Sequence, residues 1–182
     1  MKDKRPFNKE AYDSMDMPSK VALREMMKSK GYELVGDINK EEYKKYDLMF
    51  KQGDEEVTFE IEMRKPFDLI KANYDTVHIP IRKENNQSDW YIVWNIGCTE
   101  FALIETAKIR AHAKGDGLAY IECNEGTDWN YKENFIDVPK DEWEFFKKSG
   151  TDWVKEDMSK IKRIDRVAYN PDRIKELLNK KK

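Results

Sequence analysis

Residues 57–63 (VTFEIEM) alternate strictly between apolar and polar side chains, and this pattern restricts the fold more than any other feature of the chain. A period of two is typical of a β-strand that turns one face toward a hydrophobic core. Glu60 and Glu62 fall on the polar face of this predicted strand. Because a strand rises about 3.3 Å per residue, their Cβ atoms should lie roughly 6–7 Å apart on one side of the sheet.

A second strand is predicted just before it, at residues 45–51 (KYDLMFK), where apolar and polar side chains also alternate. The sequence QGDE at residues 52–55 is typical of a turn, so the two segments should pair as a hairpin. Asp47 lies on the face of its strand that is opposite to the apolar residues. The hairpin can therefore bring Asp47 close to Glu60 and Glu62 on the neighbouring strand.

The remaining patterns predict a mixed sheet flanked by helices, which is an α/β architecture in one domain. Helices are expected at residues 19–31, 99–112, 139–149 and 171–182, and further strands at 32–35, 76–82, 90–95, 118–123 and 135–138. We expect an N-terminal arm at residues 1–18, an α/β core at 19–138, and a C-terminal helical extension of the same domain at 139–182.

Composition excludes several classes of protein. The chain has 34 Lys and Arg against 36 Asp and Glu, so its net charge of −2 does not indicate a polyanion partner. Cys98 and Cys123 are far apart, which argues against a zinc cluster or a disulfide framework. No segment has the apolar length of a membrane span or a signal peptide, so we expect a cytoplasmic protein. Glycine-rich phosphate loops and the serine-hydrolase motif are missing from the sequence.

Three carboxylates on adjacent strands suit a hard divalent cation, because Mg²⁺ and Mn²⁺ prefer oxygen ligands. Such an ion can prepare a water molecule to attack a phosphodiester and can neutralise charge on the departing oxygen. Without a cation, Asp47, Glu60 and Glu62 would repel one another. From repulsion alone, replacing one of these acids should leave the melting temperature equal or higher.

Asp47, a gap of twelve residues, and then Glu60-Ile61-Glu62 resembles the PD-(D/E)XK nuclease superfamily, which includes restriction enzymes, resolvases and phage nucleases. The resemblance covers residues 19–123 and implies a restriction-endonuclease-like αβββαβ core. It also implies a divalent-metal-dependent nuclease with Mg²⁺ or Mn²⁺ as cofactor, for which we expect DNA as the substrate, although the sequence does not separate DNA from RNA. The small size and dense charge would suit a phage-type protein. Asp47 and Glu60 match the two acids of the family motif, whereas Glu62 stands where the family usually has lysine. Some members add a metal-binding acid on the first helix, where this chain has Glu25.

Another basic residue could replace the motif lysine. Arg82 and Lys83, at the end of the segment HIPIRK, are the first candidates, and Lys108 on the second predicted helix is the alternative. Arg64 continues the face that carries Glu60 and Glu62, and His78 lies on the strand that leads to Arg82. We expect such cations to grip the scissile phosphate or to orient the attacking water.

Other interpretations remain open. Alternating glutamates are also typical of a solvated strand face, His78 of a structural histidine, and Glu25 of an exposed helix. A nuclease-like module that binds nucleic acid or a protein without catalysis would equally explain the glutamate at the lysine position. A third possibility is an interaction protein with an exposed aromatic patch at residues 139–154. A nuclease with one site per chain could cut both strands as a homodimer.

Overall fold

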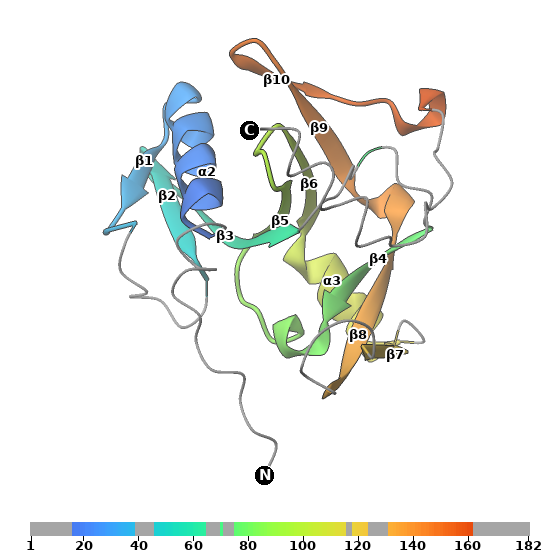
Figure 1. Cartoon of the computed structure of the whole chain (residues 1–182). Coiled ribbons are helices and arrows are strands. Elements are labelled where there is room, and N and C mark those ends of the chain that lie inside the picture. Colours follow the sequence, from blue (N-terminus) through green and yellow to red (C-terminus); the bar gives the residue numbers. More distant parts are fainter. Residues whose placement is uncertain are drawn as a thin grey trace, which may run out of the picture.

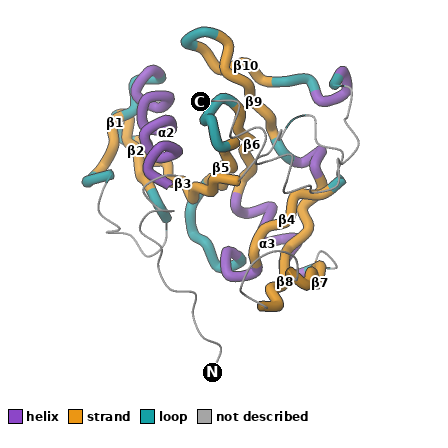
Figure 2. Tube along the Cα trace, in the orientation of Figure 1, coloured by secondary structure: helices purple, strands orange, loops and turns teal. Residues whose placement is uncertain are grey.

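The computed structural model describes residues 16–38, 46–64, 70, 75–115, 118–123 and 131–161. The helices are α2 (Met17–Ser29) and α3 (Thr106–Lys114), with short 3₁₀ turns η2 (Ile81–Lys83), η3 (Lys140–Glu142) and η4 (Met158–Lys160). The strands are β1 (Glu33–Val35), β2 (Leu48–Gln52), β3 (Glu55–Arg64), β4 (Thr76–Pro80), β5 (Trp90–Asn95), β6 (Glu100–Glu105), β7 (Leu118–Cys123), β8 (Tyr131–Pro139), β9 (Glu144–Ser149) and β10 (Asp152–Lys155). Strands account for half of the described residues (Figure 2).

Seven of the described strands form a central sheet in the order β1-β2-β3-β5-β6-β9-β10 (Figure 1). Its neighbouring strands pair antiparallel, except that β3 and β5 are parallel. The predicted α/β class with a mixed sheet flanked by helices is therefore confirmed. The hairpin prediction is also confirmed, because β2 pairs antiparallel with β3 and Gln52 faces Glu55 across the turn.

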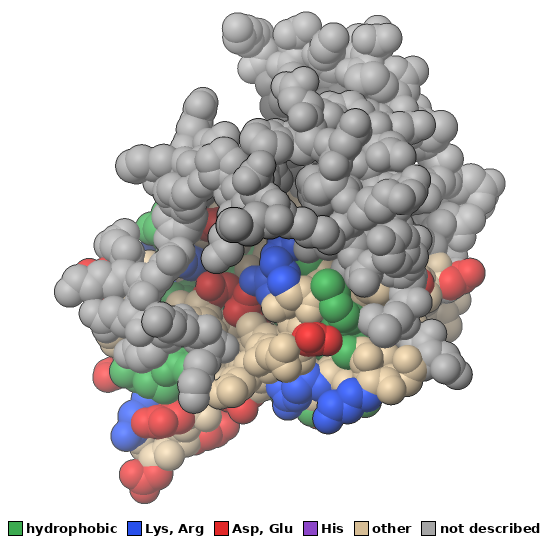
Figure 3. Space-filling model, turned by 90° about the horizontal axis from the view of Figure 1, so that it is seen from below, with side chains coloured by type: hydrophobic (Ala, Val, Ile, Leu, Met, Phe, Trp, Pro, Cys, Tyr) green, Lys and Arg blue, Asp and Glu red, His purple; other side chains and the backbone are tan. Residues whose placement is uncertain are grey.

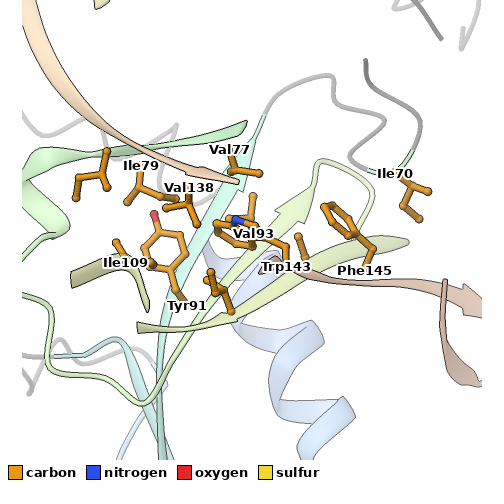
Figure 4. Close-up of a cluster of buried hydrophobic side chains, with 12 residues drawn as sticks. Ile70, Val77, Ile79, Tyr91, Val93, Ile109, Val138, Trp143 and Phe145 are labelled. Carbon is orange, nitrogen blue, oxygen red and sulfur yellow. The ribbon is translucent and has the colours of Figure 1, made fainter. Parts of the chain in front are cut away.

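Both faces of the central sheet are covered. Helix α2 packs on one face, where Leu23 contacts a core that includes Phe59 and Ile92. On the other face, Tyr91 belongs to a core that also contains residues of α3 and of a second sheet, β4-β8-β7. Figure 4 shows Val77, Ile79 and Val138 from this second sheet against Tyr91 and Val93 of β5.

The helix predicted at residues 99–112 is wrong in its first half. Residues Glu100–Glu105 form β6, and α3 begins only at Thr106. Phe101 packs in the core beneath α2, whereas Ala102 and Ile104 pack in the core beneath the second sheet. A strand that is buried on both faces is a continuous apolar run, and periodicity does not separate such a run from a buried helix.

The helix predicted at residues 139–149 is also wrong. This segment forms η3 and then β9, which lies between β6 and β10 in the central sheet. Trp143 and Phe145 are buried in the core beneath the second sheet, at 4% and 1% exposure, so they do not form an exposed aromatic docking patch. Strands β9 and β10 thus complete the central sheet, and residues 139–161 contain no α-helix. The helix predicted at residues 171–182 lies outside the described residues.

Three smaller differences concern strand ends and sheet membership. The strand predicted at 76–82 stops at Pro80, because the chain turns into η2 there. The strand at 118–123 belongs to the second sheet and not to the central one, and the strand at 135–138 extends back to Tyr131. Neither described α-helix has the length and apolar character needed to cross a membrane.

Candidate active site

Glu60, on the face of β3 predicted to be polar, is buried in the structure. Glu60 pairs in register with Tyr91, and residues that are paired across a sheet share a face. Tyr91 belongs to the core beneath the second sheet, so Glu60 lies on the same covered side. Only 5% of Glu60 is exposed. A carboxylate in such a position requires hydrogen-bond donors or a positive charge.

Two side chains from one segment supply these partners. The ammonium of Lys83 forms an ion pair with Oε1 of Glu60, and the amide of Asn86 donates a hydrogen bond to Oε2. Lys83 is the last residue of η2, and Pro80, whose ring fixes its φ angle, precedes this turn. The N–H of Asn86 donates to the carbonyl of Lys83 at 3.1 Å. Helix α3 holds this segment through Arg110, whose Nη1 donates to the carbonyl of Asn86 at 2.7 Å.

Asp47 is anchored beside the two glutamates. Its Oδ2 accepts a hydrogen bond of 2.7 Å from the backbone N–H of Ile61, the residue between Glu60 and Glu62. Its own N–H donates to the carbonyl of Phe59 at 2.9 Å. The hairpin therefore brings the carboxylate of Asp47 to the part of β3 that carries both glutamates.

Glu62 has a different set of partners from Glu60. The hydroxyl of Tyr91 donates to Oε2 of Glu62, and Nε of Arg64 donates to Oε1 at 2.8 Å. Burial raises the pKa of Tyr91 well above its usual value of 10, and the negative charge of Glu62 raises it further. The charges of Arg64 and Arg82 lower this pKa, which places the exposed Arg82 near the same group. Tyr91 thus remains a protonated donor to Glu62 at neutral pH.

Replacing Tyr91 by phenylalanine should destabilise the fold by about 1.5 kcal/mol, since Glu62 loses a donor to its charge while Arg64 and water still reach it. The cost should shrink as the pH rises above 10, because unfolded Tyr91 then ionises whereas folded Tyr91 stays protonated. The decrease should approach about 1.4 kcal/mol per pH unit. Urea unfolding of both proteins at pH 8 and pH 11 measures this difference, and an equal cost at both pH values would contradict it.

The structure separates the side chains of two other candidate residues, His78 and Glu25, from Glu60. The imidazole of His78 lies on the outer side of the second sheet, paired with Asp137, since its neighbours Val77 and Ile79 face the core. Only the backbone carbonyl of His78 reaches this region, where it accepts from Nη2 of Arg64. Glu25 lies on α2, on the opposite face of the central sheet, and pairs with Arg24 at 2.9 Å.

Lys108 is exposed and points away from η2. It lies two residues before Arg110, which corresponds to a rotation of about 200° around the helix. Arg110 is therefore the α3 cation beside this segment, and Lys83 is the candidate cation that contacts Glu60. Asn86, Tyr91 and Arg110 were not predicted. They occupy a polar loop, an apolar strand and a basic helix, and no local motif marks them.

The carboxylates fit a site for one Mg²⁺-like ion only in part. Among the described residues, no group of three His, Cys, Asp or Glu side chains lies close enough to hold a metal. The Asp47 carboxylate nevertheless binds the backbone of Ile61, the residue next to Glu60, and Mg²⁺ is commonly held by one or two carboxylates together with water and phosphate. Glu60 also already binds a cation, the Lys83 ammonium. Asp47 and Glu60 are therefore the acids left to hold such an ion, because Glu62 is engaged by Arg64 and Tyr91.

The surface seen in Figure 3 carries acidic and basic side chains next to one another, between the residues drawn in grey. This mixture agrees with the near balance of charges in the sequence.

No protein-family model, curated protein or solved structure matches this chain.

Proposed function

We propose that this chain is a divalent-metal-dependent nuclease of the PD-(D/E)XK type, which hydrolyses phosphodiester bonds in DNA. The observation that carries the proposal is the contact between Lys83 and the buried carboxylate of Glu60, two residues that are 23 positions apart. Asp47, the first acid of the motif, is anchored one residue from Glu60. An acid pair with a lysine beside it is the combination that the motif predicts.

Lys83 takes the place of the motif lysine in this proposal. The usual lysine position carries Glu62, whose charge is balanced by Arg64 at 2.8 Å. Lys83 reaches Glu60 from η2, so the cation comes from a different element on the same side of β3. Its side chain keeps 26% exposure, which leaves a path for contact with a phosphate. Arg82 precedes it and is exposed, which suits a second contact to the DNA backbone.

The chain supplies the following functions to the reaction. Asp47 and Glu60 would hold the cation, and Lys83 with Arg82 would bind and orient the scissile phosphate. The bound Mg²⁺ or Mn²⁺ would supply a water activated for attack on phosphorus and would stabilise charge on the leaving oxygen. Tyr91 and Arg64 keep Glu62 in place beside this centre. A homodimer would place one such site against each DNA strand.

Asp47→Ala should lower DNA cleavage by about a hundredfold or more, because one of two carboxylate ligands is lost. Plasmid nicking is measured with Mg²⁺ or Mn²⁺, and EDTA should abolish the activity of the unchanged protein. Asp54→Ala is the matched control, because Asp54 lies in the exposed hairpin turn at the other end of β2. Cleavage that survives in EDTA, or equal losses in both variants, would contradict the proposal.

A second candidate function is a nuclease-like module that binds nucleic acid or a protein without cutting. The observation that favours it is that both oxygens of Glu60 already have protein partners, Lys83 and Asn86. Calorimetric titration with Mn²⁺ separates the two functions. Binding that disappears in Glu60→Gln supports the nuclease, and no binding supports the module.

A further inference from the structure

The side chain of Asn86 is fixed at both ends. Its Nδ2 donates to Oε2 of Glu60, and its Oδ1 accepts from the backbone N–H of Ser88 at 2.7 Å and from the Ser88 hydroxyl. An amide has donors on one side and an acceptor on the other. Ser88 therefore decides which end of the amide faces Glu60, because only one orientation satisfies both neighbours.

Ser88 is itself held inside the protein. It is 2% exposed, and its hydroxyl lies 3.0 Å from the carbonyl of Trp90 and 3.1 Å from the hydroxyl of Thr106, which is fully buried. Thr106 begins α3, and its N–H donates to the carbonyl of Asp89 at 2.9 Å. The loop before β5 is thus fastened to the start of α3 by buried polar contacts. A buried polar network whose groups all have partners makes the elements that it joins rigid.

The backbone of Asn86 joins the same arrangement. Its carbonyl accepts from Arg110 at 2.7 Å, and its N–H donates to Lys83, the residue that pairs with Oε1 of Glu60. One loop therefore presents a donor to each oxygen of Glu60. Because Asn86 occupies Oε2, the carboxylate is held in one orientation with Oε1 directed to a cation.

We propose that Asn86 is a positioning residue that orients Glu60 for metal binding, and that Ser88 acts on Glu60 through the Asn86 amide. This inference rests on the proposed function, since it assigns a role to residues around the same site. Partners that orient a ligand typically contribute tenfold to a hundredfold in metal affinity. Neither residue needs to contact the metal or the DNA for this effect.

The test is a double-mutant cycle with Mn²⁺ affinity as the readout, measured by isothermal titration calorimetry on the full chain. Asn86→Ala should weaken Mn²⁺ binding by about tenfold. Ser88→Ala should weaken it by less, because alanine removes the hydroxyl but keeps the backbone N–H that donates to the Asn86 amide. The double variant should bind no more weakly than Asn86→Ala alone, because Ser88 has no route to Glu60 once the amide is gone. Asn85→Ala is the matched control and should bind normally, since Asn85 is exposed and contacts Glu84 at 3.2 Å.

A purely structural role for these residues predicts a different result. The contacts of Ser88 with Trp90 and Thr106 persist in the Asn86→Ala background, so structural losses would add and the cycle would show no coupling. Additive losses, or normal Mn²⁺ affinity in Asn86→Ala, would overturn the inference while leaving the nuclease proposal intact. Mn²⁺ binding by the unchanged protein that does not depend on Glu60 would overturn both.

Discussion

Replacing Glu60 by glutamine should reduce Mg²⁺-dependent DNA cleavage by on the order of a thousandfold, while the chain stays folded. Glutamine keeps the shape of the side chain but removes the negative charge that would hold the cation. It also presents an NH₂ group to either Lys83 or Asn86, both of which are donors, so one hydrogen bond is lost. The measurement is the initial rate of plasmid nicking, with circular dichroism to verify folding.

The control for this prediction lies on the same strand. Glu56 is exposed and only 3.8 Å from Lys51, so Glu56→Gln removes the same charge from β3 without touching the site. Its cleavage rate should equal that of the unchanged protein. If Glu60→Gln retains full activity, or if both variants lose the same fraction, Glu60 is not a ligand for the catalytic metal.

Replacing Lys83 by methionine should lower the free energy of unfolding by about 3 kcal/mol, because it leaves the charge of Glu60 buried without a counter-ion. This value is at the low end of the usual cost of breaking a buried ion pair, because Lys83 is 26% exposed and water can enter. The double variant Glu60→Gln, Lys83→Met should recover most of this loss, because the uncompensated charge is then gone. Urea unfolding of the two single variants and the double variant measures the coupling.

Lys51→Met is the matched control for stability. Lys51 and Glu56 are both about half exposed, and a surface pair of this kind contributes at most about 1 kcal/mol. Equal losses in Lys83→Met and Lys51→Met would show that the Glu60–Lys83 contact does not stabilise the fold. The pairing also reverses the expectation from repulsion alone: removing Glu60 should lower the melting temperature, because Lys83 and Asn86 lose their acceptor.

The most regular patterns in the sequence predicted their elements well. Residues 57–63 lie within β3, and residues 90–95 form β5 with the predicted bounds. Residues 57–63 alternate between apolar and polar side chains, and residues 90–95 are a short apolar run between polar loops. Each of these local patterns corresponds to one strand. The helix predicted at 99–112 failed because β6 is apolar on both faces, and only the second sheet explains why both faces are buried.

The candidate site divides in the same way. Spacing along one hairpin was enough to predict that Asp47 would lie beside Glu60 and Glu62, because a turn between two strands fixes which residues become neighbours. This spacing could not predict which residues balance the charges of Asp47, Glu60 and Glu62. That depends on η2, which reaches β3 only because the core beneath the second sheet brings β4 onto that face.

The sequence by itself determined the acids, their strand and the set of basic residues that could join them. Only the tertiary structure decided among those cations, placing Lys83 on Glu60 and Lys108 on an exposed side of α3. It also buried Glu60, on a strand face that alternation had predicted to be polar. The physical reason is that strand periodicity is a property of neighbouring residues, whereas burial and ion pairing depend on which distant segment packs against them.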